Sequence, residues 1–179
     1  MRPVPQRTRF FVAGEGDSEY SYALFLQRLA DQLGLHIYLD RSIGGGGDPL
    51  ATVEQAVEDL RKGLRRGSYR GRFVLLDADL IGRDPNRDQK MRNLCARWQL
   101  DLILQDCDHE AVLLRHYNGH QTRRPPAGSA ETELRRVWQG YSKPMAADDL
   151  LKQFGITDVR RVAGVEPDFQ RMFRALGLI

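Results

Sequence analysis

The stretch RFVLLDADLIG, residues 72–82, carries an apolar run directly into two aspartates. Asp77 and Asp79 stand at the end of this run, separated by one alanine, and Gly82 follows them. A buried strand gains nothing from carboxylates at its tip, so these groups need a partner, and Mg²⁺ prefers hard oxygen ligands of this kind. The pattern therefore predicts that Asp77 and Asp79 bind a divalent cation, Mg²⁺ or Mn²⁺. The alternative is that they cap the next helix or pair with Arg83.

Other acidic residues also follow apolar segments. Glu15 comes after RFFVA, Glu19 lies one helical turn further on, and Glu110 comes soon after LDLILQ. Closely placed carboxylates raise each other's pKa values unless a cation neutralises them. We therefore expect Glu19 and Glu110 to join the metal site, whereas Asp106 and Asp108 are better placed to cap the helix that contains Glu110.

The elements that must position these acids alternate along the chain. Apolar runs predict strands at 9–13, 36–40, 72–77 and 100–105, and amphipathic spacing predicts helices at 18–33, 50–66, 87–98 and 109–118. Ser18 is the expected N-cap of the first helix. This alternation predicts an α/β fold with a central, mostly parallel four-stranded sheet flanked by helices. Functional groups collect outside the carboxyl ends of such strands, and the acids fall there.

The last third of the chain has a different character. A loop at 118–129 is followed by short helices, expected at 130–138, 146–154 and 167–176. We interpret residues 1–118 as the α/β core and residues 119–179 as a helical C-terminal extension of the same domain.

The composition excludes several classes of protein. The 179 residues are 41% hydrophobic and 28% charged, which is ordinary for a globular protein. There is no apolar run of about 18 residues and no signal peptide, so we expect no membrane association and a cytoplasmic location. Cys95 and Cys107 are too few for a disulfide scaffold, and a reducing compartment suits them.

Basic residues are clustered although the formal net charge is only +3. Clusters at 61–72 and 115–124, and further basic residues between 83 and 97, fit a phosphate-rich partner such as DNA or RNA. Solvated helix faces are the ordinary alternative. The expected nucleic-acid contacts are Arg65, Arg66, Arg83, Lys90, Arg123 and Arg124.

Two of these motifs together resemble the Toprim domain of topoisomerases, primases and nucleases of the overcoming-lysogenization-defect type. That domain has a glutamate in a glycine-containing turn, followed after a later strand by Asp-x-Asp-x-x-Gly. Glu15 in EGDSE and Asp77, Asp79 and Gly82 in DADLIG match this pattern.

Most of the chain is similar to the RloB-like family. The segment GEGDSEYSYALFLQRL resembles the family's Glu-Gly-x-x-Thr-Glu opening, with Ser18 in place of threonine. DCDHEAVLLRHY resembles its Asn-Pro-x-Phe-Glu segment, so Glu110 takes the place of the family's glutamate, although His109 replaces the aromatic residue. WQGYSK resembles its Gly-Tyr-x-Lys segment, matched by Tyr141 and Lys143.

The resemblance implies a magnesium-dependent phosphodiesterase, expected to be a nuclease in a restriction-linked or phage-defence system. Glu15 would act as general acid or base, or share the metal, because a carboxyl with a raised pKa delivers protons near neutral pH. Lys143, with Lys90 or Arg83 as substitutes, would neutralise the scissile phosphate. The resemblance also implies an ATPase partner subunit, and a homo-oligomer is a further expectation.

Two alternatives stay open. The chain could be a non-catalytic partner subunit of a defence ATPase, or a phosphatase or phosphotransferase that uses the Asp-x-Asp motif. A zinc site at Cys107, His109, His116 and His120 lacks the usual spacing, and surface histidines are the better interpretation. The glycine run within 43–49 lacks the Gly-Lys-Ser/Thr ending of a nucleotide-binding loop, so we expect a flexible loop there.

Overall fold

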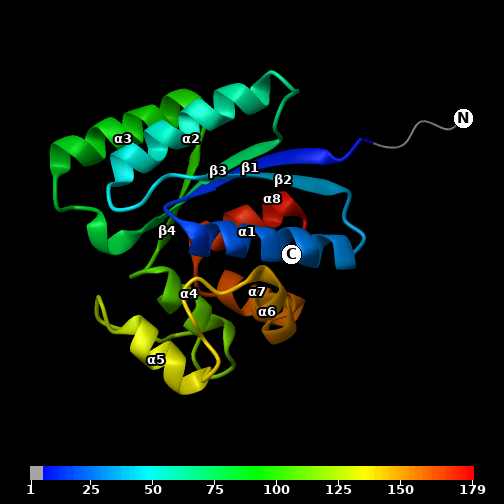
Figure 1. Ribbon diagram of the computed structural model, residues 1–179, viewed down its shortest axis with the longest axis vertical. Coiled ribbons are helices and arrows are strands. Elements are labelled where there is room, and N and C mark those ends of the chain that lie inside the picture. The colour runs from blue at the N-terminus through cyan, green and yellow to red at the C-terminus, as the bar shows by residue number, and fades with distance from the viewer. Residues whose placement is uncertain (1–5) are drawn as a thin grey trace, which may run out of the picture.

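The computed structural model describes residues 6–179 and shows a four-stranded sheet between two layers of helices (Figure 1). All strand pairs are parallel, and the strand order is β2-β1-β3-β4. The strands are β1 (Thr8–Gly14), β2 (Ile37–Ile43), β3 (Gly71–Asp77) and β4 (Asp101–Gln105). The central pair, β1 and β3, therefore ends in the segments that carry Glu15 and Asp77.

Helices cover both faces of this sheet. One face carries α2 (Pro49–Leu64) and α3 (Pro85–Trp98), and the other carries α1 (Asp17–Gln32) and the C-terminal helices, as Figure 1 shows. The alternation of side chains along β1 separates the two layers, because Phe10 and Val12 pack with α1 while Phe11 and Ala13 pack with α2. Residues of both faces are buried, as a parallel sheet requires.

The helices around the site begin at identifiable caps. Asp48 and Asp84 accept hydrogen bonds from backbone N–H groups at the starts of α2 and α3, and each is followed by a proline at the first helical position. Asp108 caps the helix after β4 in the same way, by accepting the N–H of Ala111 at 2.9 Å. These caps fix where each helix leaves the carboxyl edge of the sheet.

The C-terminal third wraps α1 and α4 rather than forming a separate unit. It supplies Phe154, Phe169 and Phe173 to the hydrophobic core that also holds Tyr22 and Leu26 of α1. Helix α4 (His109–His116) follows β4, and the helices of the C-terminal third are α5 (Ala130–Val137), α6 (Ala147–Gln153), α7 (Ile156–Ala163) and α8 (Pro167–Leu176). No helix among residues 6–179 is long and apolar enough to cross a membrane.

The α/β class, the four-stranded parallel sheet and the C-terminal helices are as predicted. Several details of the prediction were wrong. Helix α7 was not expected, and β2 extends to Ile43 instead of ending at residue 40. Ser18 is not the N-cap of α1: the cap is Gly16, and the helix begins at Asp17. After β3, which ends at Asp77, the chain turns through the short 3₁₀ helix η1 (Ala78–Leu80), which contains Asp79.

Candidate functional site

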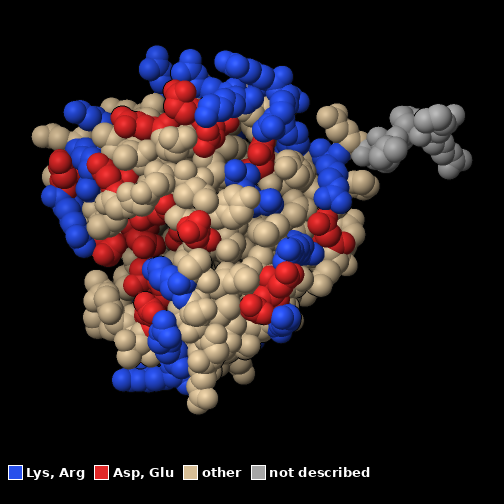
Figure 2. Space-filling view, viewed as in Figure 1, with Lys and Arg blue, Asp and Glu red and all other residues tan. Residues whose placement is uncertain are grey.

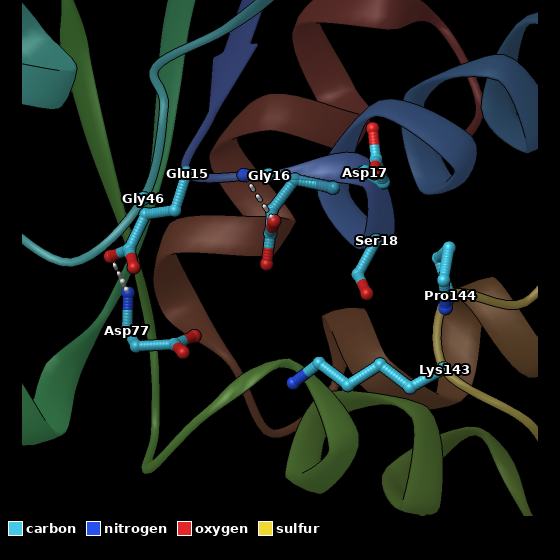
Figure 3. Close-up of a pocket in the computed structure, with 9 residues that line it drawn as sticks. Glu15, Gly16, Asp17, Ser18, Gly46, Asp77, Lys143 and Pro144 are labelled. Carbon is cyan, nitrogen blue, oxygen red and sulfur yellow. Dashed lines mark hydrogen bonds between the residues drawn. The ribbon is translucent and has the colours of Figure 1, made fainter.

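A polar cavity of about 280 Å³ lies at the carboxyl ends of β1 and β3. Of the predicted site residues, Glu15, Glu19, Asp77 and Lys143 line it, and in Figure 3 the side chains of Asp77 and Lys143 extend toward each other across this space. These groups come from the end of β1, the first turn of α1, the end of β3 and the segment between α5 and α6. The sheet therefore gathers acids from distant parts of the sequence, as the strand pattern predicted.

Glu15 joins the ends of the two central strands. It follows Gly14, the last residue of β1, and its Oε1 accepts the backbone N–H of Asp77 at 2.8 Å (Figure 3). Burial raises the pKa of Glu15 above its ordinary value, and the negative charges of Glu19 and Asp79 add to this effect. The hydrogen bond from Asp77 acts in the opposite direction without cancelling the rise.

Glu19 is held against the sheet by both of its oxygens. Oε2 accepts the N–H of Gly16 at 3.0 Å, and Oε1 accepts the side-chain amide of Gln105 at 3.0 Å. Only 5% of Glu19 is exposed. Gly14 permits this approach, because a Cβ on Gly14 would lie 2.1 Å from the Cβ of Glu19.

Asp77 is the most strongly perturbed carboxyl in the cavity. Burial raises its pKa to about 8, and the neighbouring charges of Glu15 and Glu19 contribute further. Its Oδ1 accepts the same Gln105 amide nitrogen at 3.0 Å that Glu19 accepts. One buried amide therefore draws the two carboxylates together.

The orientation of Gln105 is set by His109. His109 Nδ1 lies 2.8 Å from Gln105 Oε1, and because an amide oxygen only accepts hydrogen bonds, the imidazole donates through Nδ1. The amide NH₂ of Gln105 is thereby directed at Glu19 and Asp77. Gln105 ends β4 as one polar residue after an apolar run, and neither Gln105 nor His109 was predicted from the sequence to belong to this carboxylate site.

Glu110 does not line the cavity, although we predicted it as a metal ligand. It is 2% exposed, and its Oε1 accepts the Tyr141 hydroxyl at 2.8 Å and pairs with Lys143 Nζ at 2.9 Å. Burial acts to raise the pKa of Glu110, but His109, Lys143 and Tyr141 outweigh it, and the net shift is downward. Glu110 is thus a charged anchor that holds Lys143 at the rim.

Asp79 also lies outside the cavity lining. Its Oδ2 pairs with Arg83 Nη2 at 3.1 Å, and Arg83 Nε donates to the Asp79 carbonyl oxygen at 2.8 Å. This is the ion pair that the sequence offered as the alternative to metal binding. Asp106 caps no helix and instead lies 3.3 Å from Arg124, so the expectation of a helix cap holds for Asp108 and fails for Asp106.

The interpretation of surface histidines was wrong for two of them. His109 is 2% exposed and His116 is fully buried, where its Nδ1 donates to the Val112 carbonyl at 3.0 Å and its Nε2 lies 3.1 Å from the Tyr22 hydroxyl. Burial lowers the pKa of His116 to about 4, so this imidazole is a neutral core residue at physiological pH.

The predicted nucleic-acid contacts do not form one surface. Arg65 and Arg66 follow the end of α2 at the amino edge of the sheet, opposite the cavity, and Figure 2 shows Lys and Arg side chains gathered over that end of α2. Arg83 and Lys90 belong to the segment after Asp77.

The remaining two predicted contacts are ion-paired. Arg123 pairs with Glu133 at 2.9 Å and Arg124 pairs with Glu166 at 2.8 Å. Both arginines therefore also stabilise the loop before α5.

The carboxylate oxygens that line the cavity are suitable ligands for a hard cation, although they do not yet surround a common metal position. Within residues 6–179, no three His, Cys, Asp or Glu side chains are already arranged around a common metal position. Mg²⁺ needs fewer than three protein ligands, since it often binds through one or two carboxylates and keeps several waters or substrate oxygens. Asp77 and Glu19, which share the Gln105 amide, fit that requirement, and a bound cation would offset the burial and mutual repulsion that raise the pKa of Asp77.

The fold and the cavity together define an α/β protein with a carboxylate pocket at the carboxyl edge of a parallel sheet. Comparison of the chain with protein-family models, with curated proteins and with solved structures found no match.

Proposed function

We propose that this chain is a Mg²⁺-dependent phosphodiesterase of the Toprim type, and that it cleaves DNA or RNA. The observation that carries the proposal is the meeting of Glu15, Glu19 and Asp77 in one cavity with Lys143 at its rim. Such a pocket combines oxygen ligands for a divalent cation with a positive group for a phosphate, which is what phosphodiester cleavage requires. The ordered spacing of Glu15 and the Asp77 segment supports the same conclusion.

Asp77 and Glu19 would hold Mg²⁺ or Mn²⁺, and the bound cation would stabilise the negative charge that develops on the leaving oxygen. Glu15 is the proton carrier in this scheme. Its Oε1 is occupied by the Asp77 N–H, so Oε2 is the atom that would hold the proton, and burial raises the pKa of this carboxyl above its ordinary value. Lys143 positions the phosphate, while Glu110 and Tyr141 hold the loop that carries Lys143.

The same geometry disfavours a phosphatase that uses both aspartates of Asp-x-Asp. Such an enzyme needs the two carboxylates at one reaction centre, but Asp79 lies in η1, outside the cavity lining, where Arg83 holds it in an ion pair. The biological setting that we propose is restriction or phage defence, with an ATPase subunit or a second copy of this chain as partner. This setting rests on the resemblance to the RloB-like family.

The direct test is cleavage of supercoiled plasmid and of single-stranded RNA by the purified chain with Mg²⁺ or Mn²⁺. We expect Asp77→Asn and Glu15→Gln each to lower the cleavage rate by at least about 100-fold, since each removes a group that acts on the reacting phosphate. Glu15→Gln keeps a side-chain oxygen that can accept the Asp77 N–H, so the loop geometry is preserved.

Two matched variants complete this test. Asp149→Asn changes a half-exposed carboxylate on α6 that pairs with Lys152, and Asp79→Asn changes the carboxylate outside the cavity. Both are expected to retain most of the activity. Full activity in Asp77→Asn and Glu15→Gln would reject the assignment, and an inert wild-type chain that cleaves only with an added ATPase subunit would make it one part of a larger enzyme.

A further inference from the structure

The N-terminus of α1 forms one wall of the cavity. Gly16, Asp17 and Ser18 line it, and α1 continues for 16 residues from this point. The first N–H groups of a helix have no partner within the helix, and a glycine N-cap has no side chain to satisfy them. Among residues 6–179, no group accepts a hydrogen bond from the N–H of Asp17 or Ser18. The cavity therefore has free donors at the positive end of a helix dipole.

The Ser18 side chain is a second, independent feature of this wall. Ser18 is 8% exposed, no group among residues 6–179 is hydrogen-bonded to its hydroxyl, and the hydroxyl oxygen remains accessible from the cavity. Figure 3 shows this hydroxyl pointing into the cavity on the side of Lys143, while the Asp17 side chain points away from it. This hydroxyl is therefore free to donate a hydrogen bond to a ligand in the cavity, in place of water.

The two walls of the cavity have opposite electrostatic character. The helix N–H groups, the Ser18 hydroxyl and the Lys143 ammonium supply hydrogen-bond donors on one side, and Glu15 and Asp77 face them with carboxylates. Glu19 in the first turn of α1 adds a further carboxylate to the cavity, and its oxygens accept the Gly16 N–H and the Gln105 amide. The pKa of Lys143 is raised, since Glu110, Asp77 and Glu19 outweigh the opposing effect of burial, so it is fully charged at neutral pH. An anion suits the first wall and a cation the second.

We propose that the first turn of α1, the Ser18 hydroxyl and Lys143 form a binding site for a tetrahedral phosphate group, which places a nucleotide phosphate beside the carboxylates. This inference rests on the proposed function, because it identifies where the same cavity holds the phosphate of its substrate. Helix N-termini bind phosphate through free N–H groups, and the hydroxyl and the ammonium supply additional donors at about the same location. Ser18 and the N–H of Asp17 are new members of the site, and neither was predicted from the sequence to bind substrate.

The first experiment uses inorganic phosphate, without divalent cation and without turnover. Full-length protein labelled with ¹⁵N is titrated with phosphate at constant ionic strength, against sodium chloride as reference. We expect saturable shifts of the amide signals of Asp17 and Ser18, with smaller changes at Gly155, the glycine N-cap of α7 outside the cavity. Absence of saturable shifts at Asp17 and Ser18 would overturn the inference.

The second experiment measures the dissociation constant of phosphate for three variants. Ser18→Ala should weaken phosphate binding about tenfold, the effect of one hydrogen bond to a charged group. Lys143→Met should weaken it at least as much. Ser142→Ala, which changes an exposed serine next to Lys143, should bind as wild type does. An unchanged dissociation constant in Ser18→Ala, with the melting temperature maintained, would contradict a role for the hydroxyl.

These results separate the inference from the proposed function. Phosphate binding by a chain that cleaves no nucleic acid would leave the anion site standing and reject the nuclease. Metal-dependent cleavage without shifts at Asp17 and Ser18 would reject the anion site alone. If Ser18→Ala does not fold, the wild-type titration still decides the outcome, because it needs no variant.

Discussion

The carboxyl of Asp77 has a consequence for stability that follows from its pKa of about 8. An aspartate in the unfolded chain titrates near pH 4, so between pH 4 and pH 8 the folded protein holds a proton that the unfolded chain has released. The free energy of unfolding therefore falls as the pH rises through this window, and the loss is complete above pH 8.

Asp77→Asn removes this titration. We expect the variant to have a higher free energy of unfolding than wild type at pH 8, by on the order of 1 kcal/mol, with the difference shrinking toward pH 4. Urea unfolding from pH 4 to pH 9 in the presence of a chelator measures it, with Asp149→Asn as the control. Parallel pH profiles for wild type and Asp77→Asn would show that Asp77 titrates normally.

At the residue scale, the sequence identified the acids better than their partners. Glu15 and Asp77 were found because they follow apolar runs, and Glu19 because it lies one helical turn from the strand end. Gln105 carries no such signal, since a single polar residue at a strand end is ordinary, and only the folded contacts show that it joins Glu19 to Asp77. The sequence also did not decide between metal binding by Asp79 and an ion pair of Asp79 with Arg83. Both interpretations place Asp79 directly after the same strand, and only the structure shows the ion pair.

Among the elements, the joint between β1 and α1 depends on a glycine. A Cβ on Gly14 would lie 2.1 Å from the Cβ of Glu19 and 2.8 Å from its Cγ. Gly14→Ala must therefore push the first turn of α1 away from the sheet. We expect a loss of about 1–3 kcal/mol of stability, measured by denaturant unfolding, together with weaker phosphate binding.

The matched variant for this prediction is Gly155→Ala. Gly155 also precedes a helix, but a Cβ there meets open space, so the loss should stay below about 1 kcal/mol. Equal destabilisation by the two substitutions would mean that close approach to Glu19 is unimportant.

The strands and long helices were predictable because their apolar spacing is strong, and the errors occur where that spacing fails. The second half of β2 contains Asp40, Arg41 and Ser42, and these polar residues are tolerated because β2 is an edge strand with one neighbour in the sheet. Helix α7 is short and lies between Gly155 and Gly164, which mark breaks when the sequence is read alone.

In the molecule as a whole, the last third is a structural part of the core. Tyr22 and Leu26 of α1 are buried in the same cluster as Phe154, Phe169 and Phe173. A chain that ends at residue 118 would expose that apolar surface to water. We expect it to be largely unfolded or aggregated by circular dichroism and size-exclusion chromatography. A cooperative unfolding transition in this fragment would show that residues 6–118 form an independent domain.

The distribution of charge over the molecule was the least predictable feature. Composition reveals basic clusters, but it does not reveal that α2 carries Arg65 and Arg66 away from the cavity, by roughly 24 Å for 16 helical residues. A nucleic acid that contacts both ends of α2 must therefore lie along the length of the molecule. The fold class and the strand positions determine which acidic side chains come together at the edge of the sheet. The positions of basic side chains on the surface depend on the directions of the helices, which the sequence pattern does not predict.

The late position of Lys143 in the chain matters while the protein is being made. A ribosome adds the carboxylates of Glu15, Asp77 and Glu110 long before it adds the lysine that pairs with Glu110. Because domains fold as units during translation, an unfinished chain lacks both that cation and the aromatic helices on which α1 rests. If the chain cuts nucleic acid as proposed, such an order of synthesis would keep truncated products inactive.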